Sequence, residues 1–150
     1  IGTIYDQQGE NQKAEEFYRK ALAIKGDFAP AANNLAWKIA EKGGNIDEAL
    51  DYARIAKGQM PDNPSVMDTL GWIYYLKGSY LNAISELQDS VELMPDNPVV
   101  NYHLGMALLK NNKPAEAEEY LKNALELDPG FKGAEEAKNA LKEAGAAVKQ

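Results

Sequence analysis

The pentapeptide MPDNP occurs twice in this chain, at Met60–Pro64 and again at Met94–Pro98, 34 residues later. Proline cannot continue a helix, whereas asparagine and aspartate readily cap the start of a new one. The last proline of each copy follows such capping residues, and proline also fits the first turn of a helix. Each copy therefore predicts a sharp corner at which one helix ends and the next begins.

Three columns of similar residues repeat along the chain with a period of 34 or 35 residues. The columns contain Pro61, Pro95 and Pro129; Gly2, Ala36, Gly71 and Gly105; and Ala14, Ala49, Ala83 and Ala117. The one extra residue falls in the Gly-Gly turn at 42–45, where an insertion is easily tolerated. Apolar residues within each unit recur every three or four positions, as they do on a helix face. The chain is therefore predicted to repeat a helix–turn–helix unit, and no strand is expected.

Small residues inside these helices indicate how the units pack. Glycine in a helix interior costs about 1 kcal/mol relative to alanine. Gly71 and Gly105 therefore predict close contact between two helices, which offsets that cost, and the alanine column predicts the same on the second helix. Ser79 is expected to cap the second helix of its unit with its side-chain oxygen.

The unit length, the Leu-Gly pairs at 70–71 and 104–105, the aromatic Tyr74, the alanine column and the terminal proline resemble the tetratricopeptide repeat. The resemblance covers Ile1 to about Pro129 and implies an all-α fold, a right-handed α-solenoid of antiparallel helix pairs. The expected divisions are a truncated repeat at 1–28, full repeats at 29–63, 64–97 and 98–131, and a C-terminal capping helix at 132–150. The truncated first repeat indicates a fragment of a longer array, interpreted as bacterial.

Proteins of this family curl so that the first helix of each repeat lines a concave groove. The resemblance therefore implies that positions just after the glycine column, and near the start of each first helix, face a partner. The candidate partner-binding residues are Thr3, Asp6, Asn33, Trp37, Glu41, Asp68, Trp72, Tyr75, Tyr102 and Met106, with Ala40, Leu109 and Glu136 extending the same columns. Because tryptophan and tyrosine dominate interface energetics, the two indoles are the favoured anchors. The alternative is that both indoles only pack against the next helix across the groove.

A well-known use of this fold is to grip the carboxyl end of a peptide through lysine, arginine and asparagine. The corresponding positions here hold Asn33, Asp68, Thr69, Val99 and His103. Only Asn33 fits, so this carboxylate clamp is not expected. The groove instead carries Asp6, Glu41 and Asp68 against Lys110. The expected partner is a protein or peptide with apolar anchors and a neutral or basic character, unless the acids only keep the surface soluble.

Other functions find little support in the composition. Sixteen lysines and arginines against 23 acids give a net charge of −7 and a pI near 4.8, which disfavours nucleic acid as a partner. No apolar run approaches the roughly 18 residues of a membrane span, so no membrane insertion is expected. The chain has no cysteine and one histidine, so neither a metal site nor a cofactor is predicted. His103 is interpreted as structural or groove-lining, and no enzyme activity is expected.

The predicted function is that of a protein–protein interaction scaffold. The alternative is a self-assembling structural protein that uses its exposed repeat ends or its convex face. Self-association through the truncated N-terminal repeat, where Ile1 and Ile4 are apolar, is the specific form of that alternative. The compartment stays open, since cytoplasm and periplasm are both compatible with the sequence.

Overall fold

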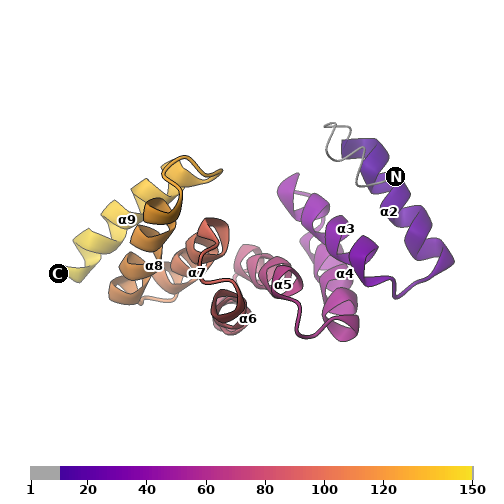
Figure 1. Ribbon diagram of the computed structural model, residues 1–150, viewed down its shortest axis with the longest axis horizontal. Coiled ribbons are helices and arrows are strands. Elements are labelled where there is room, and N and C mark those ends of the chain that lie inside the picture. The colour runs from indigo at the N-terminus through magenta and orange to yellow at the C-terminus, as the bar shows by residue number, and fades with distance from the viewer. Residues whose placement is uncertain (1–10, 150) are drawn as a thin grey trace.

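The protein was analysed as a computed structural model that describes residues 11–149, and Figure 1 shows that these residues form an arc of stacked helices. Within that range the regular structure is entirely helical. The helices are α2 (Asn11–Ile24), α3 (Ala29–Glu41), α4 (Ile46–Gln59), α5 (Pro64–Lys77), α6 (Tyr80–Leu93), α7 (Pro98–Lys110), α8 (Pro114–Leu127) and α9 (Ala134–Val148). The all-α helical repeat fold is confirmed. The exact division into repeats stays a proposal.

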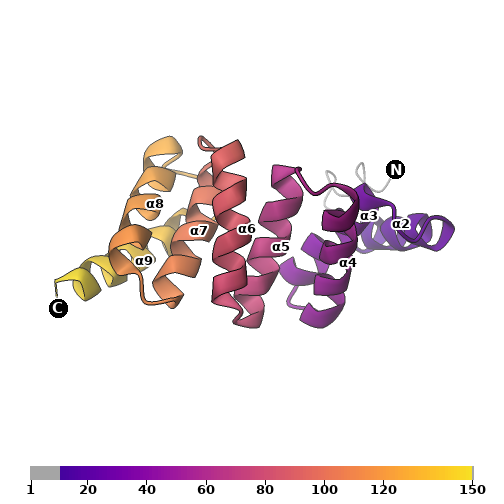
Figure 2. The same cartoon turned by 90° about the horizontal axis from the view of Figure 1, so that it is seen from below.

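The helices form an inner and an outer row, as Figures 1 and 2 show from two directions. Each inner helix of the series α3, α5, α7 and α9 touches the next inner helix. Among the described residues, the backbones of the outer helices α4, α6 and α8 approach inner helices and not one another, although the side chains of Lys57 on α4 and Glu86 on α6 form an ion pair at 2.9 Å. Because the inner row is drawn together and the outer row is spread apart, the stack curves and its inner side is concave.

The two MPDNP corners form as predicted, and in each the asparagine supplies the cap. The Asn63 side chain accepts a hydrogen bond from the Val66 backbone N–H at 3.2 Å, and Asn97 accepts one from Val99 at 3.0 Å. The prolines that follow them occupy the first turns of α5 and α7. The expectation for Ser79 is wrong: it stands at the start of α6, but its side chain makes no capping bond.

The predicted close contacts at the glycine column are confirmed. A Cβ atom added to Gly71 would lie 2.6 Å from Leu87 Cγ, and one added to Gly105 would lie 2.7 Å from Leu121 Cγ. Both distances are far below van der Waals contact. The inner and outer helix of each pair therefore approach as closely as they do only because no side chain stands at these positions.

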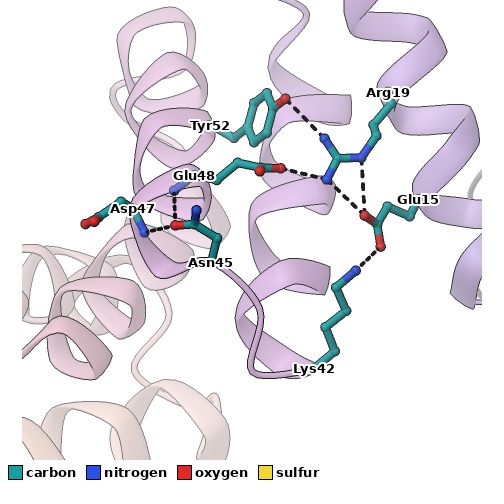
Figure 3. A network of polar contacts seen from close by, with 7 residues as sticks. All are labelled: Glu15, Arg19, Lys42, Asn45, Asp47, Glu48 and Tyr52. Atoms are coloured by element: carbon teal, nitrogen blue, oxygen red, sulfur yellow. Dashed lines mark hydrogen bonds and ion pairs between the residues drawn. The ribbon is translucent and has the colours of Figure 1, made fainter.

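A polar network fixes α2 against α3 and α4, and Figure 3 shows its members. Arg19 Nη2 donates to Glu15 Oε1 at 2.9 Å and to Glu48 Oε1 at 2.6 Å. Lys42 Nζ, just after α3, donates to the other Glu15 oxygen at 2.5 Å. One carboxylate thus joins cations from two different elements, which orients the first described helix on the stack.

This network makes a specific pH dependence of stability testable at Glu15. The hydrogen bond from Lys42, followed by that from Arg19, lowers the pKa of Glu15 below its ordinary value of 4.5. The unfolded chain therefore binds this proton more readily, so the stabilisation is complete above pH 4.5 and is lost as the pH falls through the lowered pKa. We expect Glu15→Gln to lower the free energy of unfolding by up to about 1 kcal/mol at neutral pH.

The measurement is urea denaturation of wild type and variant at a series of pH values from neutral to acid. The difference between them should shrink below pH 4.5. Glu16→Gln is the matched control, because Glu16 is exposed on the same helix and lies outside the network. A Glu15→Gln difference that stays constant across the whole pH range would contradict the assignment.

Candidate functional site

The concave side of the arc contains a hollow of about 530 Å³, built by residues of α3, α5 and α7 and by the start of α9. This volume lies within the range of about 300–1,000 Å³ that is typical of ligand sites. Among the predicted groove residues, the hollow is lined by Trp37, Glu41, Trp72 and Tyr102, together with the flanking Ala40 and Glu136. The structure therefore brings both indoles to one place on the inner face.

The aromatic rings around the hollow form a continuous stack. Trp72 lies between Tyr75, at a ring-centroid distance of 4.4 Å, and His103, at 4.1 Å, and both pairs are nearly parallel. Trp37 meets the other side of this group through a tilted contact with His103 at 5.9 Å. Both indoles are half-buried rather than sealed. They pack against neighbouring rings across the groove and still present part of their surface to it, and their role in binding stays a prediction.

Asp68 does not act as the free groove acid that the sequence suggested. Its Oδ1 atom accepts a hydrogen bond from His103 Nδ1 at 2.7 Å, and Asp68 does not line the hollow. His103 is only 3% exposed, although it contributes one wall. The interpretation of His103 as structural or groove-lining agrees with this position. Asp68 is best described as the residue that orients the imidazole against Trp72.

The rim of the hollow carries an ion pair that sequence reasoning missed. Lys132 Nζ, in the turn before α9, lies 2.8 Å from Glu41 Oε1 at the end of α3. Lys38 Nζ lies 3.8 Å from the other oxygen of Glu41. The hydrogen bond to Glu41 raises the pKa of Lys132. The cation expected here was Lys110, but that residue is exposed at the end of α7 and does not line the hollow.

The turn that presents Lys132 is anchored on both sides. Phe131 is 7% exposed and meets the Tyr102 ring at 5.6 Å. Gly133 has φ of 110°, a conformation that favours glycine, and a Cβ there would lie 3.2 Å from Tyr102. The backbone of Lys132 is therefore held at the rim even though its side chain is exposed. An aromatic residue and a glycine flanking a lysine before the last helix is the sequence signal that could have identified this position.

The remaining predicted residues lie beside the hollow or outside the described range. Tyr75 stacks on Trp72 without lining the hollow, and burial raises its pKa. Met106 packs half-buried against the core of the C-terminal helices. Tyr102, which does line the hollow, is 8% exposed, and burial raises its pKa to about 12. Thr3 and Asp6 lie outside the described residues, as do Ile1 and Ile4.

Asn33 is half-buried near the start of α3 and does not line the hollow. Its Oδ1 atom is buried and accepts no hydrogen bond. Asp68 is the residue equivalent to Asn33 in the next repeat, and it is hydrogen-bonded to His103 of the following inner helix. One repeat earlier, the position of His103 is occupied by Thr69, which would have to be the partner of Asn33. The Thr69 hydroxyl instead donates to the Ser65 carbonyl at 3.0 Å. The only residue compatible with a carboxylate clamp is thus away from the hollow.

Residues 11–149 contain no cluster of three or more histidine, aspartate or glutamate side chains arranged to hold a metal ion. In the same range, no helix combines the length and the apolar character that crossing a bilayer requires. The hollow itself presents aromatic and aliphatic surface in its centre and charged groups at its rim.

Comparison with known proteins agrees with this architecture. The sequence profile of the tetratricopeptide repeat matches residues 98–131 and residues 1–28. A TPR repeat-containing protein of Pseudomonas aeruginosa is 28% identical over 102 residues, which is 68% of this chain and 17% of that protein. The chain thus spans about a sixth of the length of this relative. The chain belongs to the tetratricopeptide repeat family.

Solved structures show the same fold over nearly the whole chain. PilF of Pseudomonas aeruginosa aligns over 99% of this chain and 66% of that one, with a TM-score of 0.77 and 25% identity. The first TPR domain of RPAP3, solved with the HSP90 peptide SRMEEVD, aligns over 81% of this chain and 94% of that one. Its TM-score is 0.72 and its identity 24%, so this second likeness concerns the fold.

Proposed function

We propose that this segment is a protein–protein interaction scaffold that holds a partner segment on its concave face. The observation that carries the proposal is the hollow of about 530 Å³ that both half-buried tryptophans of the chain line together with Tyr102 and His103. Partly exposed tryptophan in a concave apolar site is typical of the centre of an interface, where a few anchors supply most of the binding energy.

The lining of the hollow indicates the kind of partner. Trp37, Trp72 and Val99 offer apolar surface to an apolar anchor, and the hollow is large enough for one or two side chains. The charged groups at its rim are Glu41, Glu136 and Lys132, so acids outnumber bases there. A partner segment with an apolar anchor and a neutral or basic character complements this surface. The RPAP3 domain, whose solved structure contains a bound peptide, supports the use of this fold for holding a peptide segment.

The proposal is tested by probing an array of random ten-residue peptides and titrating the strongest-binding peptide by fluorescence anisotropy. Trp37→Ala is the informative variant, because Trp37 makes one tilted ring contact among the described residues whereas Trp72 is stacked against two other rings. We expect the affinity to fall by about 30-fold, since an anchoring tryptophan contributes about 2 kcal/mol or more.

Leu81→Ala is the matched control, because Leu81 is an apolar side chain that is 73% exposed on the outer helix α6. It should leave the affinity unchanged. Thermal melting of both variants shows whether folding is intact. If no peptide binds, or if Trp37→Ala binds as tightly as wild type, the concave face is not the binding surface. Self-association through Ile1 and Ile4 stays a prediction, to be checked by light scattering at increasing concentration.

A further inference from the structure

The ion pair at the rim joins two parts of the chain that the stack itself does not bring together. Glu41 and Lys132 are 91 positions apart in sequence, yet their side chains meet at 2.8 Å. Helices α3 and α9, at whose ends they lie, make no helix-to-helix contact. The pair therefore reaches across the mouth of the hollow from opposite sides, whereas the Lys38–Glu41, Lys122–Glu118 and Lys138–Glu135 pairs each lie within one helix.

The two members of the pair differ in how firmly they are held. The Lys132 side chain is 87% exposed and reaches Glu41 from the solvated turn, whereas the Glu41 side chain is 37% exposed and also lies beside Lys38. An exposed ion pair of this kind contributes little stability, because water screens the charges and a long side chain must be ordered. Lys132 can therefore leave at small cost, while Glu41 stays at the rim.

We propose that Lys132 Nζ occupies the place of a partner's cation, and that the hollow takes a peptide segment in which arginine or lysine lies next to an apolar anchor. This inference rests on the proposed function. The incoming basic side chain pairs with Glu41 and displaces Lys132 into solvent, while the apolar anchor lies against Trp37 and Trp72. The exchange is close to neutral in charge, because one exposed cation replaces another on the same carboxylate.

The charges of the surrounding residues favour a basic occupant over an acidic one. Glu136, on the same rim, is exposed on the first turn of α9 and leaves a second acid facing the mouth. Among the described residues, Lys132 is the only lysine or arginine that lines the hollow, and the one histidine there, His103, is hydrogen-bonded to the Asp68 carboxylate. Arginine suits the position better than lysine, because its guanidinium can donate two hydrogen bonds to one carboxylate.

Two substitutions at the rim give opposite expected signs, which separates an exchangeable pair from a structural one. The probe is the strongest-binding array peptide, together with a derivative in which its basic residues are glutamine. Glu41→Gln should weaken binding of the parent peptide by about 5-fold, the upper range for an exposed ion pair. Lys132→Gln should strengthen it by about 2- to 5-fold, because the intramolecular competitor is removed. Both differences should vanish with the glutamine derivative.

The proposal is overturned if Lys132→Gln weakens binding of the parent peptide or leaves it unchanged, or if Glu41→Gln leaves that binding unchanged. It is also overturned if either effect persists with the glutamine derivative, or if the peptides that bind on the array lack basic residues. In each of these cases Trp37→Ala still reports on the proposed function separately. If Trp37→Ala abolishes binding while Glu41→Gln and Lys132→Gln both bind the peptide like wild type, the scaffold function stands and the cation exchange is wrong. If Trp37→Ala is harmless, both fail.

Discussion

Gly71→Leu is expected to lower the free energy of unfolding by about 3 kcal/mol, the upper end of the range for overpacking in a core. The first side-chain atom alone would lie 2.6 Å from Leu87 Cγ and 3.3 Å from the Ala83 carbonyl oxygen. Leu87 is fully buried and cannot move aside without displacing its own neighbours. Helices α5 and α6 must therefore separate. Urea denaturation followed by circular dichroism measures the loss.

The chain supplies its own control for helix propensity. Gly58, in α4, has nothing within 4 Å of the place where a Cβ would stand. Gly58→Ala should stabilise the protein by about 0.5 kcal/mol, because alanine is the better helix former. Gly71→Ala should destabilise it despite the same gain in propensity. If both alanine variants stabilise the protein equally, the close approach of α5 and α6 is not what requires glycine at position 71.

Asn101→Ala is the second substitution for which we expect a large effect, a loss of about 2–4 kcal/mol. Asn101 is 1% exposed. Its amide nitrogen donates to the Pro95 carbonyl at 3.0 Å and to the Asn97 carbonyl at 2.9 Å. Its oxygen accepts a hydrogen bond from Asn123 Nδ2 at 3.0 Å. Alanine leaves a cavity and removes all three bonds, two of them to the second MPDNP corner and one to α8.

Two further variants test this reason for the loss. Asn123→Ala removes a single bond from a half-buried partner and should cost about 1 kcal/mol. Asn101→Asp keeps the shape but sets a carboxylate oxygen against the Pro95 and Asn97 carbonyls, so it should be at least as damaging as alanine at neutral pH. Denaturant midpoints rank the three variants. An Asn101→Ala protein as stable as Asn123→Ala would show that the corner does not depend on this side chain.

The fold follows from local sequence to an unusual degree, because the features that define each unit act within a few residues. Pro64 and Asn63 set a helix start by their own backbone and side-chain chemistry. Gly71 identifies a close approach because a glycine in a helix needs a packing reason. Ser79 shows the limit of this reasoning, since a residue of capping type stands at the helix start without making the bond.

The candidate site is predicted less completely, because it depends on how the units are rotated relative to one another. The period places Trp37 and Trp72 at equivalent positions, so their common presence in the hollow follows from the sequence. The pairing of Asp68 with His103 and that of Glu41 with Lys132 depend on the curvature of the stack. A repeat of 34 residues does not reveal which positions meet across several units. The indoles could therefore be predicted, whereas the true rim cation could not.

Each described helix contacts only helices that are close to it in the stack, whereas the Glu41–Lys132 ion pair spans the mouth of the hollow. This difference has a mechanical consequence. A row of helices that touch only their neighbours can lengthen through small rotations between adjacent helices, which add up along the stack. We expect such a stretch to separate Glu41 from Lys132 before it disturbs any helix pair, because an exposed ion pair contributes little stability. Tension along the array therefore widens the hollow. By the reciprocity of coupled equilibria, an occupant that prefers one width also sets the length at which the array rests.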